Sequence, residues 1–324
     1  MRENPILAFF LVFLSAAAIF AGPETAATGS DNPPAVAATI KPLDGLVAAV
    51  MAGAGTPTLL IPGGESPHIH TVRPSEARVI ASADLVFWIG PTLESSYAKT
   101  LKALARGKVV TMTEVPGIEL LAERGAGIAR HDHGDDHEVV RAGTDLDPSR
   151  VDPHIWLDPV NAKAMVRAIA DALAEADPAR ADLYRSNAAK MDARLDALDS
   201  ELKSELAGVR DIPFITYHDA YQYFERRYGL DNAGAVALSP EQQPGARHLS
   251  DLREVIANEK VVCVFTEPQF RPALAETLVT GTKARIGTLD PESQPAIAAG
   301  PDFYFGLMRA LAKDLRACLA PSGG

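Results

Sequence analysis

The stretch Val151-Asp152-Pro153-His154-Ile155-Trp156-Leu157-Asp158-Pro159 lies near the middle of the 324-residue chain. Each of its two prolines fixes its own φ and restricts the residue before it, so His154 is held on a stiff backbone. Rigid presentation of one imidazole suits a metal ligand, because a ligand must be oriented before the ion arrives. Taken alone, the stretch is explained equally well by a histidine that only caps a loop.

The residues that follow this stretch have a strongly helical pattern. Helices are predicted over 161–176 and 179–209, with Asp177-Pro178 between them. The second helix carries large apolar residues at three-, four- and seven-residue steps, namely Leu183, Met191, Leu195, Leu198, Leu202 and Leu206. At roughly 1.5 Å per residue this helix would be about 45 Å long. That length predicts a stiff connector between two domains.

On both sides of the helical segment, short β-branched runs alternate with helical stretches. The predicted strands are 35–40, 58–61, 84–89 and 108–112 before it, and 213–217, 233–238, 261–266 and 284–289 after it. Such alternation indicates βαβ units and a mainly parallel sheet. The sequence therefore predicts the α/β class, with two lobes, each a mainly parallel sheet flanked by helices. One long rigid helix over 179–209 joins the lobes 35–178 and 210–324.

Residues 113–152 interrupt the alternation. Glycine, aspartate and histidine accumulate there, and the segment His131-Asp132-His133-Gly134-Asp135-Asp136-His137 is poor in apolar side chains. We therefore expect an exposed, mobile loop. Its three histidines, His131, His133 and His137, could form a secondary metal site. A solvated linker with incidental histidines is the alternative.

The N-terminus predicts export. Residues 1–22 have the pattern of a secretory signal peptide, in which Arg2 precedes an apolar run that ends in small residues. The run is too short to indicate a membrane span, and residues 23–34 have the composition of a flexible leader. A formal net charge of -11 argues against nucleic acid or an anionic membrane surface as a partner.

The chain has two cysteines, Cys263 and Cys318. In an exported protein an even pair indicates a disulfide, and two buried free thiols are the alternative. Because there is no third cysteine and no Cys-x-x-Cys motif, a metal site built from thiolates is not expected.

Histidines and carboxylates follow several predicted strands at the point where each strand ends. His68 and His218 follow strands of the first and second lobe, and Glu267 and Asp290 follow two further strands of the second. Ligands in open α/β sheets bind beyond the carboxyl ends of the strands, where these side chains and His154 could meet. Three imidazoles and one carboxylate suit a four-coordinate ion such as Zn²⁺. Each residue also has a structural alternative: Asp290 could begin a turn, Glu267 could pair with an arginine, and His218 could cap a helix.

Several short motifs together resemble the zinc-binding proteins of bacterial ABC uptake systems, the ZnuA-type or cluster A-I substrate-binding proteins. The matching stretches are Ile40-Lys41-Pro42-Leu43, Ser66-Pro67-His68, Arg73-Pro74-Ser75, residues 83–91, Asp152–Pro159, residues 218–224, Ser239-Pro240-Glu241, residues 263–270 and Leu289-Asp290-Pro291. The resemblance extends from about residue 35 to the C-terminus. It implies two α/β lobes, bridged by a long helix, with the ion between them.

The resemblance also implies which residues hold the ion. The histidines of these motifs are His68, His154 and His218. Manganese-binding relatives tend to have a carboxylate at the position of His218, so the imidazole implies zinc. Asp290 matches the fourth ligand of some relatives, while Glu65, Glu267 and water remain alternatives. His70 stands where the family usually has tyrosine, and is either an extra donor or a loop residue.

The resemblance further implies that Cys263 and Cys318 are bonded to each other, and that the protein is a monomeric periplasmic receptor. Such a receptor captures Zn²⁺ in the cleft between the lobes and delivers it to the membrane permease of an ABC transporter, without catalysis. A manganese or iron receptor is one alternative. A zinc-dependent hydrolase is another, because three protein ligands and a water also form a catalytic zinc site. The chain lacks the His-Glu-x-x-His motif and the nucleophile elbow that would favour an enzyme.

Overall fold

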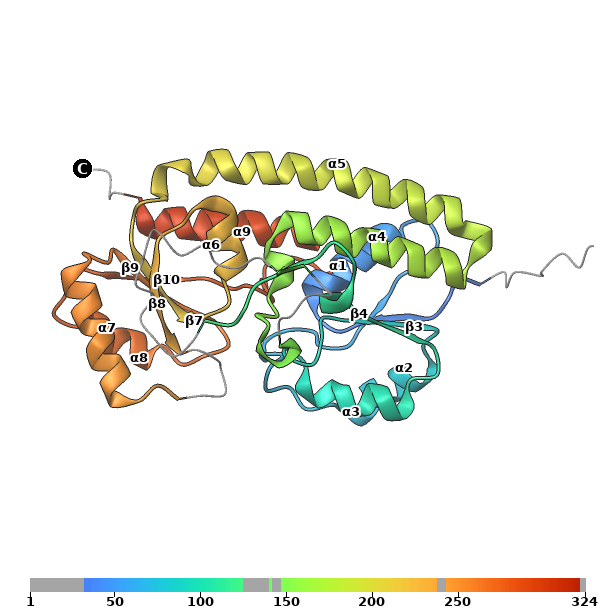
Figure 1. The fold of residues 1–324 in the computed structure, drawn as a ribbon, viewed down its shortest axis with the longest axis horizontal. Coiled ribbons are helices and arrows are strands. Elements are labelled where there is room, and N and C mark those ends of the chain that lie inside the picture. The colour runs from blue at the N-terminus through green and yellow to red at the C-terminus, as the bar shows by residue number, and fades with distance from the viewer. Residues whose placement is uncertain (1–31, 125–139, 142–146, 238–242, 321–324) are drawn as a thin grey trace, which may run out of the picture.

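The computed structural model describes residues 32–124, 140–141, 147–237 and 243–320. The expected signal peptide, most of the leader and His131, His133 and His137 lie outside these residues. Figure 1 shows two sheets side by side, with a layer of long helices running over both. No helix in the described part of the chain has the length and apolar character needed to cross a membrane.

The first lobe is built on a parallel sheet with the strand order β2-β1-β3-β4. Its strands are β1 (Val36–Ala38), β2 (Thr58–Leu59), β3 (Leu85–Trp88) and β4 (Lys108–Thr111). All four residues of β3 are buried, as expected for a central strand covered on both faces. The covering helices are α1 (Lys41–Val50), α2 (Pro74–Ser82) and α3 (Ser95–Leu104), with α2 and α3 below the sheet in Figure 1.

The second lobe has a parallel sheet with the order β10-β9-β7-β8. Its strands are β7 (Phe214–His218), β8 (Asn232–Ala237), β9 (Cys263–Thr266) and β10 (Arg285–Thr288). The helices of this lobe are α6 (Gln222–Tyr228), α7 (Ala246–Asn258), α8 (Ala273–Val279) and α9 (Phe303–Leu319). The two parallel sheets flanked by helices confirm the predicted fold class.

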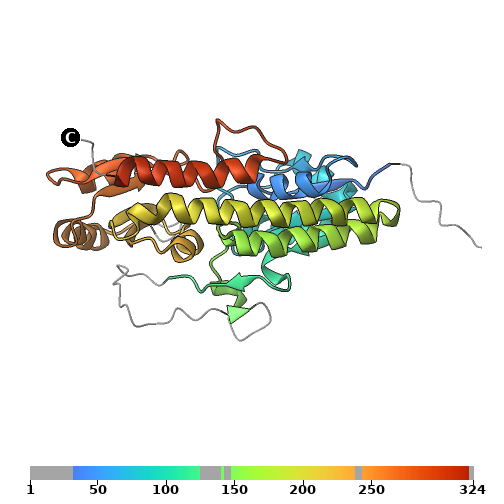
Figure 2. The same ribbon diagram turned by 90° about the horizontal axis from the view of Figure 1, so that it is seen from above.

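A helical pair, α4 (Pro159–Ala176) and α5 (Ala181–Leu206), follows the central His154 stretch. Figures 1 and 2 show α5 extending over both lobes, beside α4 at one end and α9 at the other. Met191, Leu195, Leu198, Leu202 and Leu206 are buried, which confirms the apolar face predicted for this helix except at Leu183, which is only half-buried. The predicted bounds were wider because short 3-10 turns, Pro178–Arg180 and Ala207–Val209, adjoin α5 at each end.

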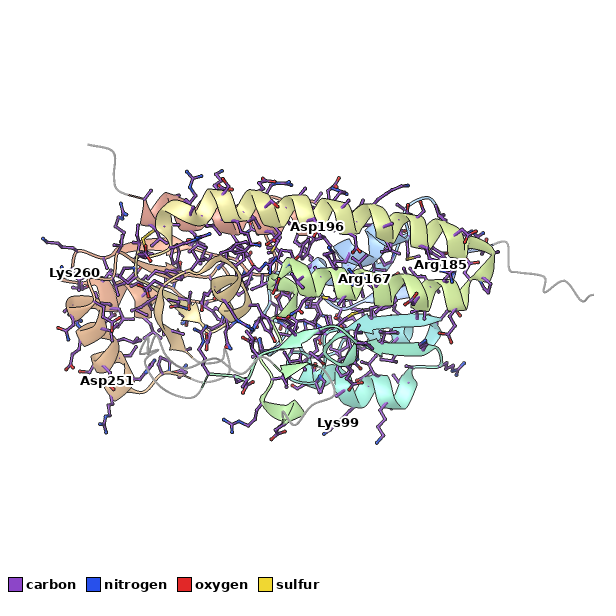
Figure 3. All side chains as sticks on the ribbon, turned by 45° about the horizontal axis from the view of Figure 1, so that its top comes forward. Lys99, Arg167, Arg185, Asp196, Asp251 and Lys260 are labelled. Carbon is purple, nitrogen blue, oxygen red and sulfur yellow. A yellow bond between two sulfur atoms is a disulfide. The ribbon has the colours of Figure 1, made fainter. Side chains whose placement is uncertain are left out.

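Charged side chains cover the outer surfaces of α4 and α5, where Figure 3 labels Arg167, Arg185 and Asp196. Ion pairs between the two helices include Arg167 with Asp192 at 3.1 Å and Lys163 with Asp196 at 2.7 Å. Such exposed pairs stabilise a fold by only about 0–1 kcal/mol each. The buried apolar face therefore holds the helical pair in place.

The predicted exposed loop over residues 113–152 differs from the structure at both ends. Ile118, Leu121 and Val151 are all buried in the main core, and Val151 forms a β-bridge with Ala122. A short antiparallel ribbon joins β5 (Glu119–Leu120) to β6 (Val140–Arg141). The burial of these apolar residues was not predicted, because they flank a polar centre and are too few to give a periodic pattern.

The two cysteines form a disulfide, with an S–S distance of 2.07 Å and a Cα–Cα distance of 6.2 Å. Cys263 begins β9, and Cys318 lies in the last turn of α9. The bond therefore ties the C-terminal helix to the centre of the second sheet, and the predicted pairing is confirmed.

Candidate metal centre

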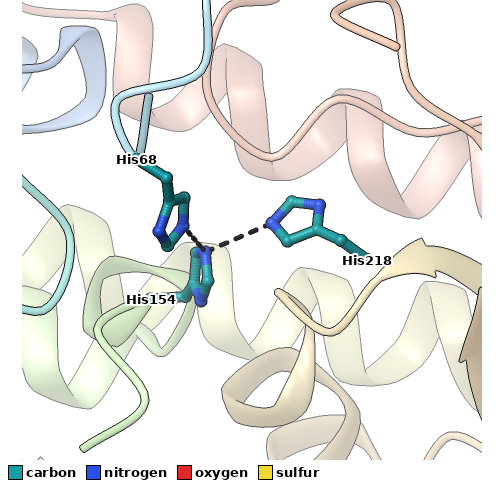
Figure 4. Close-up of side chains that lie close together, drawn as sticks. All are labelled: His68, His154 and His218. Atoms are coloured by element: carbon teal, nitrogen blue, oxygen red, sulfur yellow. Dashed lines mark hydrogen bonds between the residues drawn. The ribbon is translucent and has the colours of Figure 1, made fainter. Parts of the chain in front are cut away.

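Three histidines from distant parts of the chain meet between the two lobes (Figure 4). His68 lies in the loop after β2, His154 precedes a 3-10 turn over Ile155–Leu157, and His218 is the last residue of β7. Nε2 of His154 lies 3.3 Å from Nε2 of His68 and 3.4 Å from Nε2 of His218. In the described part of the chain, these three form the one cluster of potential ligand residues close enough to share an ion.

The distances from Nε2 of His154 to the other two Nε2 atoms match tetrahedral zinc. Two nitrogens bound at about 2.05 Å to a tetrahedral zinc ion lie about 3.3 Å apart. The observed distances of 3.3 and 3.4 Å fit this value without movement of the side chains. The cluster therefore has the shape of a preformed zinc site.

Two carboxylates fix the orientation of the buried imidazoles. Nδ1 of His154 lies 2.8 Å from Oδ1 of Asp152, and Nδ1 of His218 lies 2.6 Å from Oε1 of Glu267. A carboxylate accepts a hydrogen bond, so each Nδ1 carries a proton, and each Nε2 has its lone pair available to the cluster when the ring is neutral. Such outer partners commonly orient histidines that bind metals. Asp152 also accepts the backbone N–H of His154, at 2.9 Å, which explains why an aspartate stands two residues before this histidine.

The surroundings set different protonation tendencies for the three imidazoles. Burial, together with the neighbouring histidines, lowers the pKa of His68 and of His154 well below the ordinary value of 6.5. Burial also acts to lower the pKa of His218, but the charge and hydrogen bond of Glu267 outweigh it and raise that pKa overall. Two of the imidazoles are thus neutral near pH 7, as a metal ligand must be, while His218 holds a proton more tightly.

The cavity at the cluster is small. Its volume is about 10 Å³, close to the space that one water molecule or one ion fills. Ser66, Pro67, Trp156, Gln269, Phe270 and Glu292 line it together with the three histidines, Glu267 and Pro291. There is no room for an organic substrate beside an ion, which argues against a hydrolytic site.

The structure places Asp290 away from the histidine cluster. Its Oδ1 accepts hydrogen bonds from the backbone N–H groups of Glu292 and Ser293, at 3.1 and 2.7 Å. Its Oδ2 accepts the N–H of Gln294 at 2.8 Å. Asp290 thus closes a turn, the alternative that its position before proline had suggested, and it does not line the cavity.

The other carboxylates named as alternatives also have partners. Glu267 lines the cavity, but its Oε1 is bonded to His218. Glu65 points instead to His70, whose Nδ1 lies 3.0 Å from it. Nε2 of His70 lies 3.0 Å from Glu76, so His70 joins its own loop to α2 and is not part of the cluster. The carboxylate that sequence reasoning missed is Glu292, which lines the cavity and is buried.

The cluster lies where the two lobes are tied together. Nε1 of Trp156 donates to the carbonyl of Pro291 at 2.9 Å, and the Tyr304 hydroxyl donates to the carbonyl of Trp156 at 2.8 Å. On the other side, the Tyr223 hydroxyl donates to the carbonyl of Asp152 at 2.9 Å. The His154 segment is therefore attached to the second lobe on both flanks, which fixes its imidazole relative to His218.

Known proteins resemble this chain in sequence and in fold. The family described as zinc-uptake complex component A periplasmic, ZnuA, matches residues 36–318. The high-affinity zinc uptake system protein ZnuA of Brucella suis is 40% identical over 306 residues, covering 88% of this chain and 91% of that protein. The protein of the same name from Yersinia pestis is 34% identical over 316 residues, covering 94% of this chain and 96% of that protein. The periplasmic zinc-binding protein TroA of Treponema pallidum shares the fold, with a TM-score of 0.73 at 22% identity, over 90% of this chain and 100% of that one.

Proposed function

This chain belongs to the ZnuA family of periplasmic zinc-uptake components, and from that membership we propose that His68, His154 and His218 hold the transported ion. The protein is a zinc-binding receptor of an ABC uptake system and not an enzyme. Zn²⁺ is its cargo and stays chemically unchanged.

One observation carries the assignment of the site. The three histidines converge from both lobes, and Nε2 of His154 lies at the spacing of a tetrahedral zinc site from each of the other two Nε2 atoms. Buried carboxylates orient the rings of His154 and His218. Without a cation, Nε2 of His68 and Nε2 of His154 share a hydrogen bond at 3.3 Å, which a bound zinc ion would replace by coordination of both nitrogens.

The donor set favours zinc over manganese. Imidazole nitrogen suits zinc, whereas manganese prefers carboxylate, carbonyl and water oxygens. Three imidazoles in a cavity of about 10 Å³ leave no space for the several oxygen ligands of a six-coordinate ion. We therefore propose selectivity for Zn²⁺.

The family places the protein in the periplasm and gives it an ABC uptake system as its partner. We propose that residues 1–22 direct the export, and that the receptor reaches the membrane permease of that system as a monomer. Light scattering of the zinc-loaded protein would test the monomer, since a dimer would double the measured mass.

The histidines His131, His133 and His137 are proposed as a secondary, weaker zinc site. Ordering a polar segment costs about 1–2 kcal/mol of backbone entropy per residue, whereas the site between the lobes is preformed. The segment would therefore collect zinc without competing with the main site.

Titration of the metal-stripped protein with Zn²⁺ and Mn²⁺ tests the main site. Replacement of His68, His154 or His218 by alanine should weaken zinc binding by orders of magnitude. His248→Ala is the matched control, because Nε2 of His248 lies 2.9 Å from the carbonyl of Ala235, outside the cluster. Tight zinc binding by all three single variants would disprove the proposed site.

A further inference from the structure

A short strap of the first lobe, residues 119–124, crosses onto the second lobe beside the metal centre. The strap comes after β4 along the chain and lies next to α6. The Tyr223 hydroxyl of α6 accepts the backbone N–H of Leu121 at 3.0 Å, and Nε2 of Gln222 donates to the carbonyl of Ala122 at 2.9 Å. Two hydrogen bonds to the first turn of α6 therefore hold the middle of the strap.

Arg124, at the end of the strap, pairs with two carboxylates of the second lobe. Its Nε donates to Oδ2 of Asp219 at 3.0 Å, and one of its terminal nitrogens donates to Oε2 of Glu225 at 2.7 Å. The side chains of Asp219 and Glu225 are only 11% and 7% exposed, and that of Arg124 is 23% exposed. Burial acts to lower the pKa of Arg124, but the charges of Glu225 and Asp219 outweigh it and raise that pKa overall. One charged guanidinium thus bridges two buried anions.

This bridge lies directly behind His218. Asp219 is the next residue in the chain and belongs to the turn that leads from β7 into α6. The backbone N–H of Ala220 donates to the carbonyl of His218 at 2.9 Å, so the turn is tight. Without Arg124, two buried negative charges would be left unpaired at this turn, which is costly. Any shift of the turn that relieves them would carry the His218 imidazole with it.

The strap also holds the backbone that carries His154. The carbonyl of Leu121 accepts the backbone N–H of Asp152 at 2.9 Å, and the Asp152 carboxylate orients the His154 ring. The strap therefore connects the segment of one histidine to the turn of another. Arg124 is its charged contact with the turn after His218.

We propose that Arg124 is a positioning residue of the zinc site. Its bridge to Asp219 and Glu225 fixes the turn after His218. The bridge thereby sets the distance between the imidazoles of His218 and His154. A binding site keeps its affinity only when its members are held within about 0.5 Å of the productive geometry. This inference rests on the proposed three-histidine site.

Two single variants, their combination and a control test this role. Arg124→Gln removes the cation, Asp219→Asn removes the charge beside His218, and the double variant removes both. Arg227→Gln is the matched control, because Arg227 makes a similar pair with Asp199, at 2.8 and 2.6 Å, and its side chain is 26% exposed. Asp199 belongs to α5, which carries no histidine. Zinc affinity is measured by competition with a chelating dye, and thermal unfolding of the metal-free proteins reports their stability.

Arg124→Gln should lose about 10- to 100-fold in zinc affinity, the loss typical of groups that orient metal ligands. Arg227→Gln should keep the parent affinity even where it unfolds at a lower temperature. The double variant should regain part of the affinity lost in Arg124→Gln, because it leaves one buried unpaired charge and not two. It should not regain all of it, since the end of the strap stays unattached. The double variant also provides the test where Arg124→Gln does not fold.

The absorption spectrum of bound Co²⁺ gives a readout that a loss of stability alone does not change. The positions and intensities of its bands follow the coordination geometry of the ion. The spectrum should change in Arg124→Gln and stay that of the parent in Arg227→Gln.

Several results would overturn the inference. Parent affinity with an unchanged Co²⁺ spectrum in Arg124→Gln, or parent affinity in the double variant, would show that the bridge does not position the site. Equal losses in Arg124→Gln and Arg227→Gln would mean that any lost ion pair has this effect. Additive losses in the double variant would show that Arg124 does not act through Asp219. In each case His68→Ala still loses zinc binding, whereas unchanged binding in His68→Ala would refute the underlying three-histidine site.

Discussion

Replacing Glu267 by glutamine separates two effects that the outer carboxylate has on His218. The 2.6 Å contact between Oε1 of Glu267 and Nδ1 of His218 is buried on both sides. A glutamine carbonyl can still accept the Nδ1 proton, so the ring keeps its orientation but loses the adjacent negative charge. We expect zinc affinity at high pH to fall by roughly 10- to 100-fold, or about 1.4–2.7 kcal/mol, as for other outer partners of zinc ligands.

The pH dependence of the variant gives a second, independent signature. Burial lowers the pKa of His218 and Glu267 raises it by a larger amount, so a proton competes with zinc for this imidazole in the parent protein. Removing the charge lowers this pKa, and proton competition in the variant begins at a lower pH. The affinity ratio of parent to variant should therefore be largest above pH 8 and shrink as the pH falls.

Dye competition at fixed ionic strength, repeated across this pH range, measures both quantities. Glu259→Gln serves as the control, because Glu259 is an exposed carboxylate at the end of α7. Glu267→Ala should lose more affinity than Glu267→Gln, since it leaves the Nδ1–H group without its acceptor. An affinity ratio that is constant with pH, or no loss of affinity at all, would refute the role given to Glu267.

Four further outcomes are expected. In the parent protein, zinc affinity should fall as the pH drops through the pKa of His218, which is raised above 6.5. The affinity should fall more steeply only well below pH 6.5, where His68 and His154 become protonated. A constant affinity between pH 8 and 6 would contradict this expectation. Burial raises the pKa of Asp44 from 3.8 to about 6. The contribution of Asp44 to the free energy of unfolding is therefore fully present below pH 3.8, and roughly 3 kcal/mol of it is lost as the pH rises through about 6. Chemical denaturation of Asp44→Asn should not show this loss, and parallel pH profiles of the parent and the variant would contradict the expectation. Deleting residues 131–137 should leave one tight zinc-binding event in calorimetry and remove a weaker one, whereas loss of the tight event would mean that this segment supplies a main ligand. Replacing both Cys263 and Cys318 by serine should lower the free energy of unfolding by at most about 4 kcal/mol, from the 55-residue separation of the cysteines, and unchanged denaturation midpoints would argue against a stabilising bond.

The alternation of strands and helices made the fold predictable, because each strand is short, apolar and bounded by a helical pattern. The same alternation placed His68 and His218 after strands; His68 lies in the loop after β2, and His218 is itself the last residue of β7. The ribbon of β5 and β6 was not predictable, since two-residue strands carry no periodic signal. Periodicity reports burial along one element and says little about pairs of residues that meet only after folding.

The roles of the carboxylates around the site were also only partly predictable from the sequence. Asp152 had a local signal, because it stands two residues before His154 and its side chain can reach both the backbone and the ring of that residue. Asp290 and Glu292 are two residues apart, and only the turn between them decides which one reaches the cavity. Their spacing in sequence is compatible with either outcome, so the roles follow from backbone geometry.

The position of Trp156 gives the protein an optical signal of its own. The indole is almost fully buried, and its ring centroid lies 5.3 Å from that of His154. An open-shell ion such as Co²⁺ or Cu²⁺ in the cavity would quench the emission of this indole, whereas closed-shell Zn²⁺ would not. The chain has one other tryptophan, Trp88 in β3, which also emits. In a Trp88→Phe variant, fluorescence from Trp156 would distinguish which kind of ion occupies the cavity without any added label.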